Sequence, residues 1–286
     1  MIDVEAPRHL VRDAVARAIA EDLGPLGDLT AALLAPDSRA AGVIAARAAG
    51  VLAGTACVTE TFAQLDPDVV VRFELADGAP LEPATVVATI NGPARSVLTG
   101  ERTALNFLCH LSGVATLTRR FVLAAAPTRV LETRKTLPGL RALEKAAVRA
   151  GGGVNHRGSL SDLVLVKDNH LVGLTIADAV ARARHAWPGR GVEVECDRTE
   201  QVDEAVTAGA DLVMLDNFSP DAARDAVAIV RSGARPDILV EVSGGMTLDA
   251  VPAYAAVGAD LLSTSAITQS VPALDLGLDL DSVETR

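Results

Sequence analysis

One rhythm dominates the second half of this 286-residue chain. A short apolar run is followed by a turn signal and, in most cases, by an amphipathic stretch. The apolar runs are residues 128–133, 163–167, 192–196, 211–215, 238–242 and 260–264. The amphipathic stretches are 175–187, 199–208, 219–231 and 247–257. This alternation predicts six parallel strands with covering helices, an α/β arrangement. Closure into a barrel is plausible, although six units are fewer than the eight of a complete barrel.

The first half has a different pattern. Residues 9–20 have the spacing of a helix with one apolar face, and residues 42–48 and 69–75 have the composition of strands. From residue 97 to 125 the helical pattern returns, and the Ser112-Gly113 pair predicts a break into two helices. We therefore expect a small α/β layer before the repeated units.

Reactive side chains follow the predicted strands where each strand ends. In parallel α/β folds the carboxyl ends of the strands share one edge, where ligands bind. The six ends are Thr133-Arg134-Lys135-Thr136, Lys167-Asp168-Asn169-His170, Glu193 with Glu195, Asp216-Asn217, Ser243-Gly244-Gly245 and Ser263-Thr264-Ser265-Ala266. We expect these groups to converge.

The residue types at this edge indicate a particular ligand. Arg and Lys bind carboxylates or phosphates, and the N–H groups of Gly-rich turns hold phosphate. Carboxylates such as Glu195 and Asp216 bind Mg²⁺ or sugar hydroxyls, or stabilise a developing cation. Together they predict a phosphorylated sugar with a metal-bound anion at its other end. Two alternatives stay open: ordinary strand-end carboxylates, and a Schiff base on Lys167, as in barrel aldolases.

The charge distribution supports a site for a small anion. The net charge is −11, which excludes bulk binding to nucleic acid or anionic lipid. Residues 129–167 nevertheless contain eight Lys and Arg against three Asp and Glu. All three lysines of the chain (Lys135, Lys145 and Lys167) lie in this cationic stretch. Because Arg does not mimic a compact ammonium, these lysines are candidates for a specific role.

The compartment is expected to be the cytoplasm. No run of eighteen apolar residues exists, and the polar N-terminus does not resemble a signal peptide. The three cysteines (Cys57, Cys109 and Cys196) are odd in number and far apart, which favours a reducing environment over a disulfide framework.

Several blocks of the sequence resemble one enzyme family. They are Glu21–Gly24, Gly27–Thr30, Glu101–Asn106, Thr133–Thr136, Pro138-Gly139, Glu144-Lys145, Ala147-Val148, Gly151–Arg157, Lys167–His170, Leu215–Phe218 and Ser243–Gly245. The family is quinolinate phosphoribosyltransferase, also called nicotinate-nucleotide pyrophosphorylase (carboxylating). The resemblance extends from residue 21 to 278, and the GGGVNHR and KDNH blocks are its most specific part.

The resemblance implies a fold and an assembly. The expected fold is α/β, with an N-terminal α/β sandwich domain and a C-terminal open α/β barrel of about six parallel strands. The domains would be residues 1–112, with 271–286 returning to them, and residues 113–270. The assembly would be a homodimer or a hexamer in which Arg102 reaches the active site of the neighbouring subunit.

The resemblance also implies an activity. The enzyme would transfer a phosphoribosyl group from phosphoribosyl pyrophosphate to quinolinate, with decarboxylation. The products would be nicotinate mononucleotide, pyrophosphate and CO₂, on the de novo route to NAD. A same-fold paralogue associated with molybdenum transport, acting on another pyridine-like substrate, stays open as an alternative.

The family pattern assigns roles to individual residues. Quinolinate would be bound by Arg102, Thr133, Arg134, His156, Arg157 and Lys167. Phosphoribosyl pyrophosphate would be bound by Lys135, Glu195, Asp216, Ser243, Gly244, Gly245, Thr264, Ser265 and Ala266. The catalytic set would be Lys135, Lys167, Glu195 and Asp216, with Mg²⁺ held directly or indirectly by Glu195 and Asp216. The chain departs from the family pattern at Ser265, where Gly is common, and at Gln269, where His is common.

Overall fold

The computed structural model describes residues 4–284 and divides into two compact units. Residues 1–119, 136–152 and 270–286 form the first unit, and residues 120–135 and 153–269 form the second. Residues 1–3 and 285–286, which the expected first domain includes, lie outside the described part. Each unit is described by itself below.

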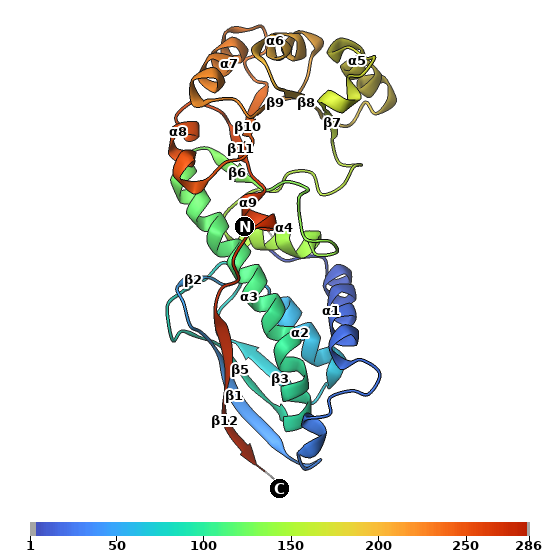
Figure 1. The fold of residues 1–286 in the computed structure, drawn as a ribbon, viewed down its shortest axis with the longest axis vertical. Coiled ribbons are helices and arrows are strands. Elements are labelled where there is room, and N and C mark those ends of the chain that lie inside the picture. Colours follow the sequence, from blue (N-terminus) through green and yellow to red (C-terminus); the bar gives the residue numbers. More distant parts are fainter. Residues whose placement is uncertain (1–3, 285–286) are drawn as a thin grey trace. The chain divides into compact units, whose positions relative to one another are not determined.

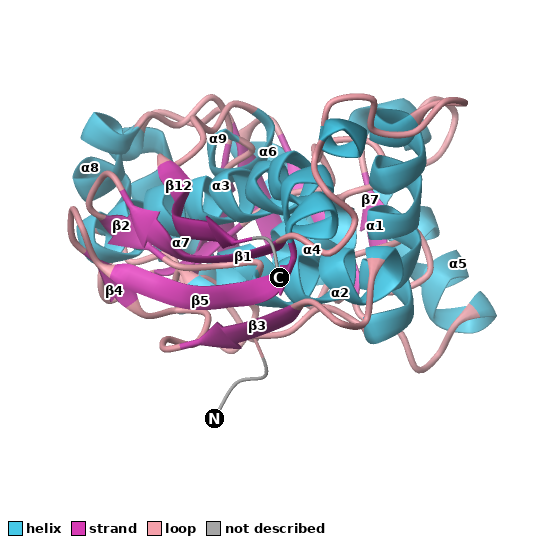
Figure 2. Ribbon diagram, turned by 90° about the horizontal axis from the view of Figure 1, so that it is seen from below, coloured by secondary structure: helices cyan, strands magenta, loops and turns pink. Residues whose placement is uncertain are grey.

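The first unit is built on an antiparallel sheet of order β12-β1-β5-β3, part of which is seen in Figure 2. Its strands are β1 (Arg39–Ala46), β3 (Val70–Phe73), β5 (Val86–Pro93) and β12 (Leu276–Glu284), and a small ladder joins β2 (Gly50–Val51) to β4 (Pro80–Leu81). Its helical elements are α1 (Arg8–Leu23), η1 (Ala31–Leu33), α2 (Thr55–Leu65), α4 (Arg141–Ala150) and the start of α3 (Ala94–Ala125). Ile44, Phe62, Ile90 and Leu108 are buried in its apolar core.

Helix α3 corrects one prediction. It runs without a break for 32 residues, so the expectation of two helices separated at Ser112-Gly113 was wrong. Tertiary contacts explain the two small residues. The Ser112 hydroxyl accepts a hydrogen bond from the N–H of Ala53 at 3.0 Å, and a Cβ on Gly113 would lie 2.2 Å from the carbonyl oxygen of Pro272. The glycine permits close approach of another segment.

Helix α4 belongs to the first unit, since residues 136–152 group with it. The carboxylate of Glu144, which is fully buried, lies 2.8 Å from Nε2 of His110 on α3 and accepts a hydrogen bond from the N–H of Leu137 at 3.2 Å. These polar contacts and the buried face of α4 attach it there. The expected boundary at residue 112 falls inside α3.

The second unit contains a six-stranded parallel sheet of order β6-β11-β10-β9-β8-β7, visible in the upper part of Figure 1. The strands are β6 (Arg129–Leu131), β7 (Val164–Val166), β8 (Val192–Cys196), β9 (Leu212–Asp216), β10 (Leu239–Ser243) and β11 (Leu261–Ser263). The helical elements are η2 (Asp168–His170), α5 (Ile176–Ala186), α6 (Thr199–Ala208), α7 (Pro220–Ser232), η3 (Leu248–Ala250), α8 (Val251–Ala255) and α9 (Ala266–Gln269). The six predicted strands are therefore confirmed, and the sheet is open because β6 and β7 are its two edges.

Local sequence signals explain how the strands connect to the helices. The hydroxyl of Thr175 caps α5 by accepting a hydrogen bond from the N–H of Asp178, and Ser219 caps α7 in the same way, with Pro220 next to it. Between β6 and β7 the chain makes one isolated parallel bridge, Leu131 to Val154. The residues after this bridge, 155–157, enter the site described next.

Candidate active site

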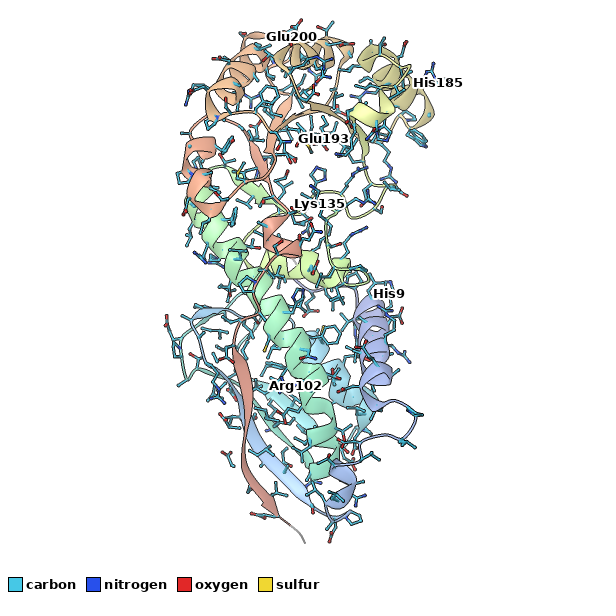
Figure 3. The ribbon with its side chains drawn as sticks, in the orientation of Figure 1. His9, Arg102, Lys135, His185, Glu193 and Glu200 are labelled. Atoms are coloured by element: carbon cyan, nitrogen blue, oxygen red, sulfur yellow. The ribbon has the colours of Figure 1, made fainter. Side chains whose placement is uncertain are left out.

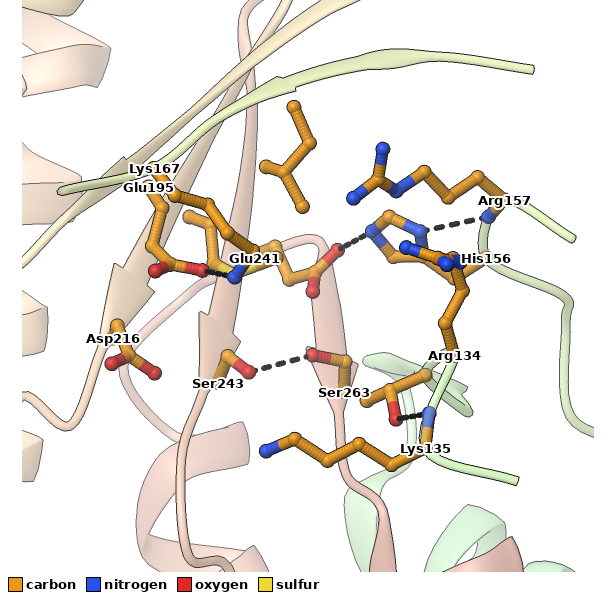
Figure 4. Close-up of a pocket in the computed structure, with 13 residues that line it drawn as sticks. Arg134, Lys135, His156, Arg157, Lys167, Glu195, Asp216, Glu241, Ser243 and Ser263 are labelled. Carbon is orange, nitrogen blue, oxygen red and sulfur yellow. Dashed lines mark hydrogen bonds and ion pairs between the residues drawn. The ribbon is translucent and has the colours of Figure 1, made fainter. Parts of the chain in front are cut away.

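A pocket of about 500 Å³ lies at the carboxyl ends of the parallel strands of the second unit (Figure 4). Pockets for small organic ligands commonly have this size. Nine of the residues predicted as site residues line it: Thr133, Arg134, Lys135, His156, Arg157, Lys167, Glu195, Asp216 and Ser243. Leu165, Met214, Glu241 and Ser263 complete the lining. The prediction that the strand ends converge is thus confirmed for these residues.

Strand register explains the arrangement of one wall of the pocket. Asp216, Ser243 and Ser263 pair across β9, β10 and β11, so their side chains form one row. The Ser263 hydroxyl donates to the Ser243 hydroxyl at 3.0 Å. Residues two positions earlier on a strand point to the same face, so Met214 and Glu241 form the row beneath.

The cations Arg134 and Lys135 reach the pocket from the segment after β6. The Thr133 hydroxyl accepts a hydrogen bond from the N–H of Lys135 at 2.9 Å, and Thr268 on α9 donates its hydroxyl to the Lys135 carbonyl at 2.8 Å. Both ends of the Lys135 backbone are therefore held. Figure 3 labels Lys135 and, on β8, Glu193 within the second unit.

Lys167 and Glu195 form an ion pair on the opposite wall. The ammonium of Lys167 contacts Oε2 of Glu195, with the two side chains 39% and 15% exposed. The N–H of Lys167 also donates to Nδ1 of His170 at 2.9 Å, which fixes the turn after β7. The pair places one positive and one negative group side by side in the lining of the pocket, where an anionic substrate would compete for the ammonium.

Arg157 is the cation with the clearest electrostatic cost. Burial lowers the pKa of Arg157, and the nearby positive charge of Arg134 lowers it further. Guanidinium groups stay charged in proteins, so the direction of the shift indicates that these surroundings disfavour the charge of Arg157. An anion bound between the two guanidiniums would relieve this repulsion.

The turns after β9 and β10 are held against each other. The N–H of Asn217 donates to the carbonyl of Ser243 at 2.9 Å. Gly244 has φ +140°, and a Cβ at this position would lie 2.7 Å from Oδ1 of Asn217. The backbone conformation and the close contact both require glycine here. The conformation of the Ser243-Gly244-Gly245 turn is therefore fixed by its contacts with the turn after β9.

The structure does not place every predicted residue in the pocket lining. Arg102 is an exposed residue on α3 in the first unit (Figure 3). Gly244, Gly245, Thr264, Ser265 and Ala266 follow the strand ends without lining the pocket. The N–H of Thr264 donates to the carbonyl of Leu131 at 3.1 Å, and its hydroxyl accepts a hydrogen bond from the N–H of Ala266 at 3.2 Å.

The cationic stretch of the sequence is divided between the two units. Arg141, Lys145 and Arg149 lie on α4, in the first unit, and do not line the pocket. The remaining lysines, Lys135 and Lys167, do line it. Clustering in sequence therefore overestimated the number of cations at the site.

Glu241 is a pocket residue that sequence reasoning missed. It lies two positions before Ser243, on the same face of β10, and it is fully buried. Glu193 has the same relation to Glu195 on β8 and is also fully buried. Strand alternation was the available signal, because each carries a charge on the face that also bears a predicted site residue.

Both family models that match the chain describe halves of one enzyme. "Quinolinate phosphoribosyl transferase, N-terminal domain" matches residues 28–112, and "Quinolinate phosphoribosyl transferase, C-terminal domain" matches residues 114–279. Among the described residues, no helix is long and apolar enough to cross a membrane.

Similar proteins cover nearly the same length. The chain is 42% identical to the nicotinate-nucleotide pyrophosphorylase [carboxylating] of Mycobacterium leprae, over 94% of this chain and 96% of that protein. It is 40% identical to the probable enzyme of the same name from Bacillus subtilis, over 91% and 90%. The solved nicotinate-nucleotide pyrophosphorylase of Francisella tularensis superimposes with a TM-score of 0.91 and 37% identity, over 98% and 99% of the two chains.

Proposed function

Because this chain belongs to the quinolinate phosphoribosyltransferase family and forms nicotinate mononucleotide in NAD biosynthesis, we propose that the pocket of its second unit is where quinolinate meets phosphoribosyl pyrophosphate. One observation carries the proposal. Four cations and the carboxylates of Glu195 and Asp216 line a single pocket at the strand ends. Such a lining suits a dicarboxylate beside a metal-bound pyrophosphate.

The quinolinate end is assigned to the cations. Arg134, Arg157 and Lys167 would hold the two carboxylates, since guanidinium groups bind carboxylates with paired hydrogen bonds. Thr133 lies beside them, and His156 lies at the back of the same pocket with a side chain 7% exposed. Lys135 would lie between quinolinate and the pyrophosphate group.

The phosphoribosyl end is assigned to the remaining strand ends. Glu195 and Asp216 would contact the ribose, and the Ser243-Gly244-Gly245 turn with residues 264–266 would hold the 5′-phosphate. Carboxylate oxygens are ligands that Mg²⁺ accepts together with substrate phosphates, so Glu195 and Asp216 fit that ion, directly or through water. Bound there, Mg²⁺ would neutralise charge on the leaving pyrophosphate.

The chemistry needs the residues mainly for placement and charge. The pyridine nitrogen attacks C1′ as pyrophosphate departs, and Glu195 and Asp216 can stabilise the positive charge that develops on the ribose. The positively charged ring nitrogen then stabilises the carbanion left at C2 when that carboxylate leaves as CO₂, and a proton adds to C2. Holding the dianion between Arg134 and Arg157 fixes the ring for both steps.

Two rival functions are less consistent with these findings. A Schiff-base aldolase needs Lys167 as a neutral amine, but its ammonium is ion-paired with Glu195. The molybdenum-transport-associated paralogue is not favoured. The relatives reported above align with this chain over nearly their full length, and they are named as carboxylating pyrophosphorylases. No observation supports a second function over the quinolinate reaction.

The assembly and the compartment are part of the proposal. Exposed Arg102 would enter the pocket of a neighbouring subunit in a homodimer or hexamer, since the pocket is lined by the second unit alone. The three cysteines are free, in keeping with the cytoplasmic location expected from the sequence.

Labelled quinolinate tests the proposed reaction. With the label in the 2-carboxylate, CO₂ release should depend on phosphoribosyl pyrophosphate and match nicotinate mononucleotide one to one. With the label in the 3-carboxylate, the label should stay in the nucleotide. Release from both positions, or release without phosphoribosyl pyrophosphate, would contradict the proposal.

A further inference from the structure

Three buried carboxylates, one of which lines the pocket, are outside the set assigned to substrates. Glu132, directly after β6, Glu193 on β8 and Glu241 on β10 are each fully buried. Buried carboxylates are costly unless they bind a partner, so these three glutamates require an explanation. All three converge on the segment Asn155–Arg157.

Glu132 holds the start of this segment. Its Oε2 accepts a hydrogen bond from the side-chain amide of Asn155 at 2.8 Å, and its Oε1 accepts one from the backbone N–H of His156 at 3.1 Å. These bonds are important because residues 155–157 belong to no strand or helix. The carboxylate therefore provides hydrogen bonds that a neighbouring strand would otherwise provide to this segment.

Glu193 and Glu241 hold the imidazole of His156. Nε2 of His156 lies 3.2 Å from Oε2 of Glu193 and 3.4 Å from Oε2 of Glu241, and Figure 4 marks the contact with Glu241. The other ring nitrogen, Nδ1, accepts a hydrogen bond from the backbone N–H of Arg157 at 2.7 Å. Nδ1 is hydrogen-bonded to the backbone of Arg157, and Nε2 lies within ion-pair distance of carboxylates on two strands of the sheet.

The same three side chains have the spacing of a metal site. One potential ligand atom from each of His156, Glu193 and Glu241 lies within 4.8 Å of the others. The hydrogen bond to Nδ1 leaves the ring proton on Nε2, where it faces the carboxylates. A metal ligand needs a free lone pair at that nitrogen, so the arrangement favours a proton between His156 and the glutamates.

We propose that Glu132, Glu193 and Glu241 are positioning residues that hold His156, and that His156 in turn positions the backbone of Arg157. In this role His156 does not donate a ring N–H to a substrate carboxylate. The inference rests on the proposed function, because it assigns Arg157 to quinolinate. Arg157 is the next residue in the chain, its guanidinium donates to the carbonyl of Leu163 at 3.3 Å, and its side chain lines the pocket. Displacing the imidazole would move the backbone from which this guanidinium projects.

Substitutions of His156 separate the two roles. In His156→Gln the amide oxygen can accept from the N–H of Arg157 and the amide nitrogen can donate to the glutamates, whereas His156→Ala can do neither. We expect the KM for quinolinate to stay within about fivefold of wild type in His156→Gln and to rise about fiftyfold in His156→Ala. Equal losses in the two variants would overturn the proposal.

Substitutions of the glutamates provide the second arm. The double variant Glu193→Gln with Glu241→Gln should raise the KM for quinolinate at least tenfold and change that for phosphoribosyl pyrophosphate less than threefold. The NMR signal of His156 should titrate at lower pH than in wild type. Glu204→Gln, an exposed change on α6, is the control and should alter neither.

The outcomes can be told apart. If the His156 signal shifts but the KM for quinolinate is unchanged, the anchoring role is wrong. If both KM values change in parallel, the glutamates support the fold in general and the specific role is also wrong. If wild-type protein makes no nicotinate mononucleotide from quinolinate, the proposed function itself fails. Single glutamate variants supply the same comparison where the double variant does not fold, as judged by circular dichroism.

Discussion

Arg134 and Arg157 place two like charges in one partly buried pocket. Burial lowers the pKa of Arg157, and the charge of Arg134 adds to the shift. The charge of Arg157 is therefore disfavoured in this pocket, and a negatively charged ligand would complement it. This relation connects the free energy of unfolding to the chemistry of the substrate.

Removing either guanidinium should affect binding and stability in opposite directions. Arg134→Met or Arg157→Met should lower kcat/KM for quinolinate, since a charge-assisted carboxylate contact is lost. The ratio of kcat/KM values should correspond to a loss of roughly 2–4 kcal/mol in transition-state binding free energy. The unliganded variant should unfold at an equal or higher temperature, because the repulsion is relieved. Steady-state kinetics and thermal unfolding check both effects, and full quinolinate turnover in either variant would contradict the assignment.

Glu195 should be important for rate. Its carboxylate contacts Lys167 and is assigned to the ribose, where positive charge develops in the transition state. Glu195→Gln should lower kcat by about 10²–10³-fold, the scale seen when one electrostatic contact to a transition state is removed. A change confined to the KM for phosphoribosyl pyrophosphate would show that Glu195 only binds that substrate.

Two adjacent glycines form a matched pair for stability. Gly244→Ala must place a Cβ 2.7 Å from Oδ1 of Asn217 at φ +140°, whereas a Cβ on Gly245 meets nothing within 4 Å. Gly244→Ala should lose about 1–3 kcal/mol of unfolding free energy, the usual cost of such backbone strain. Gly245→Ala should change that free energy little. Chemical denaturation measures both, and equal losses would show that the turn is not held as described.

A shared site should show complementation. Arg102→Ala and Lys135→Ala alter residues that the two proposed subunits contribute to one pocket. Each variant alone should have little activity, and a mixed dimer would contain one intact site. Mixing after partial dissociation should therefore restore part of the activity. If the mixture has only the summed activity of its components, Arg102 does not act on a neighbouring subunit.

Much of the fold and of the site was predictable from the sequence. The six strands of the second unit were identified because short apolar runs alternate with amphipathic stretches, and parallel strands bring their carboxyl ends to one edge. That rule brought Arg134, Lys167, Glu195 and Asp216 together although they are far apart in the chain.

Other features depended on tertiary contacts that no local pattern contains. Ser112-Gly113 has the composition of a helix break, yet it lies in a continuous helix. The Ser112 hydroxyl bonds the backbone of Ala53, and the lack of a side chain on Gly113 allows the Pro272 carbonyl to approach. Lys145 belongs to the cationic stretch but lies on α4 in the first unit. Strand alternation indicated the face of Glu241, but only the structure shows that this carboxylate contacts His156.

The central claim is that the pocket selects a pyridine dicarboxylate and joins it to a phosphoribosyl group. The most direct measurement is nicotinate mononucleotide formation from phosphoribosyl pyrophosphate and Mg²⁺, with quinolinate and nicotinate as parallel substrates. The account predicts product from quinolinate, little or none from nicotinate, and loss of the quinolinate reaction in Arg157→Met. Equal turnover of the two acids, or product from neither, would contradict it.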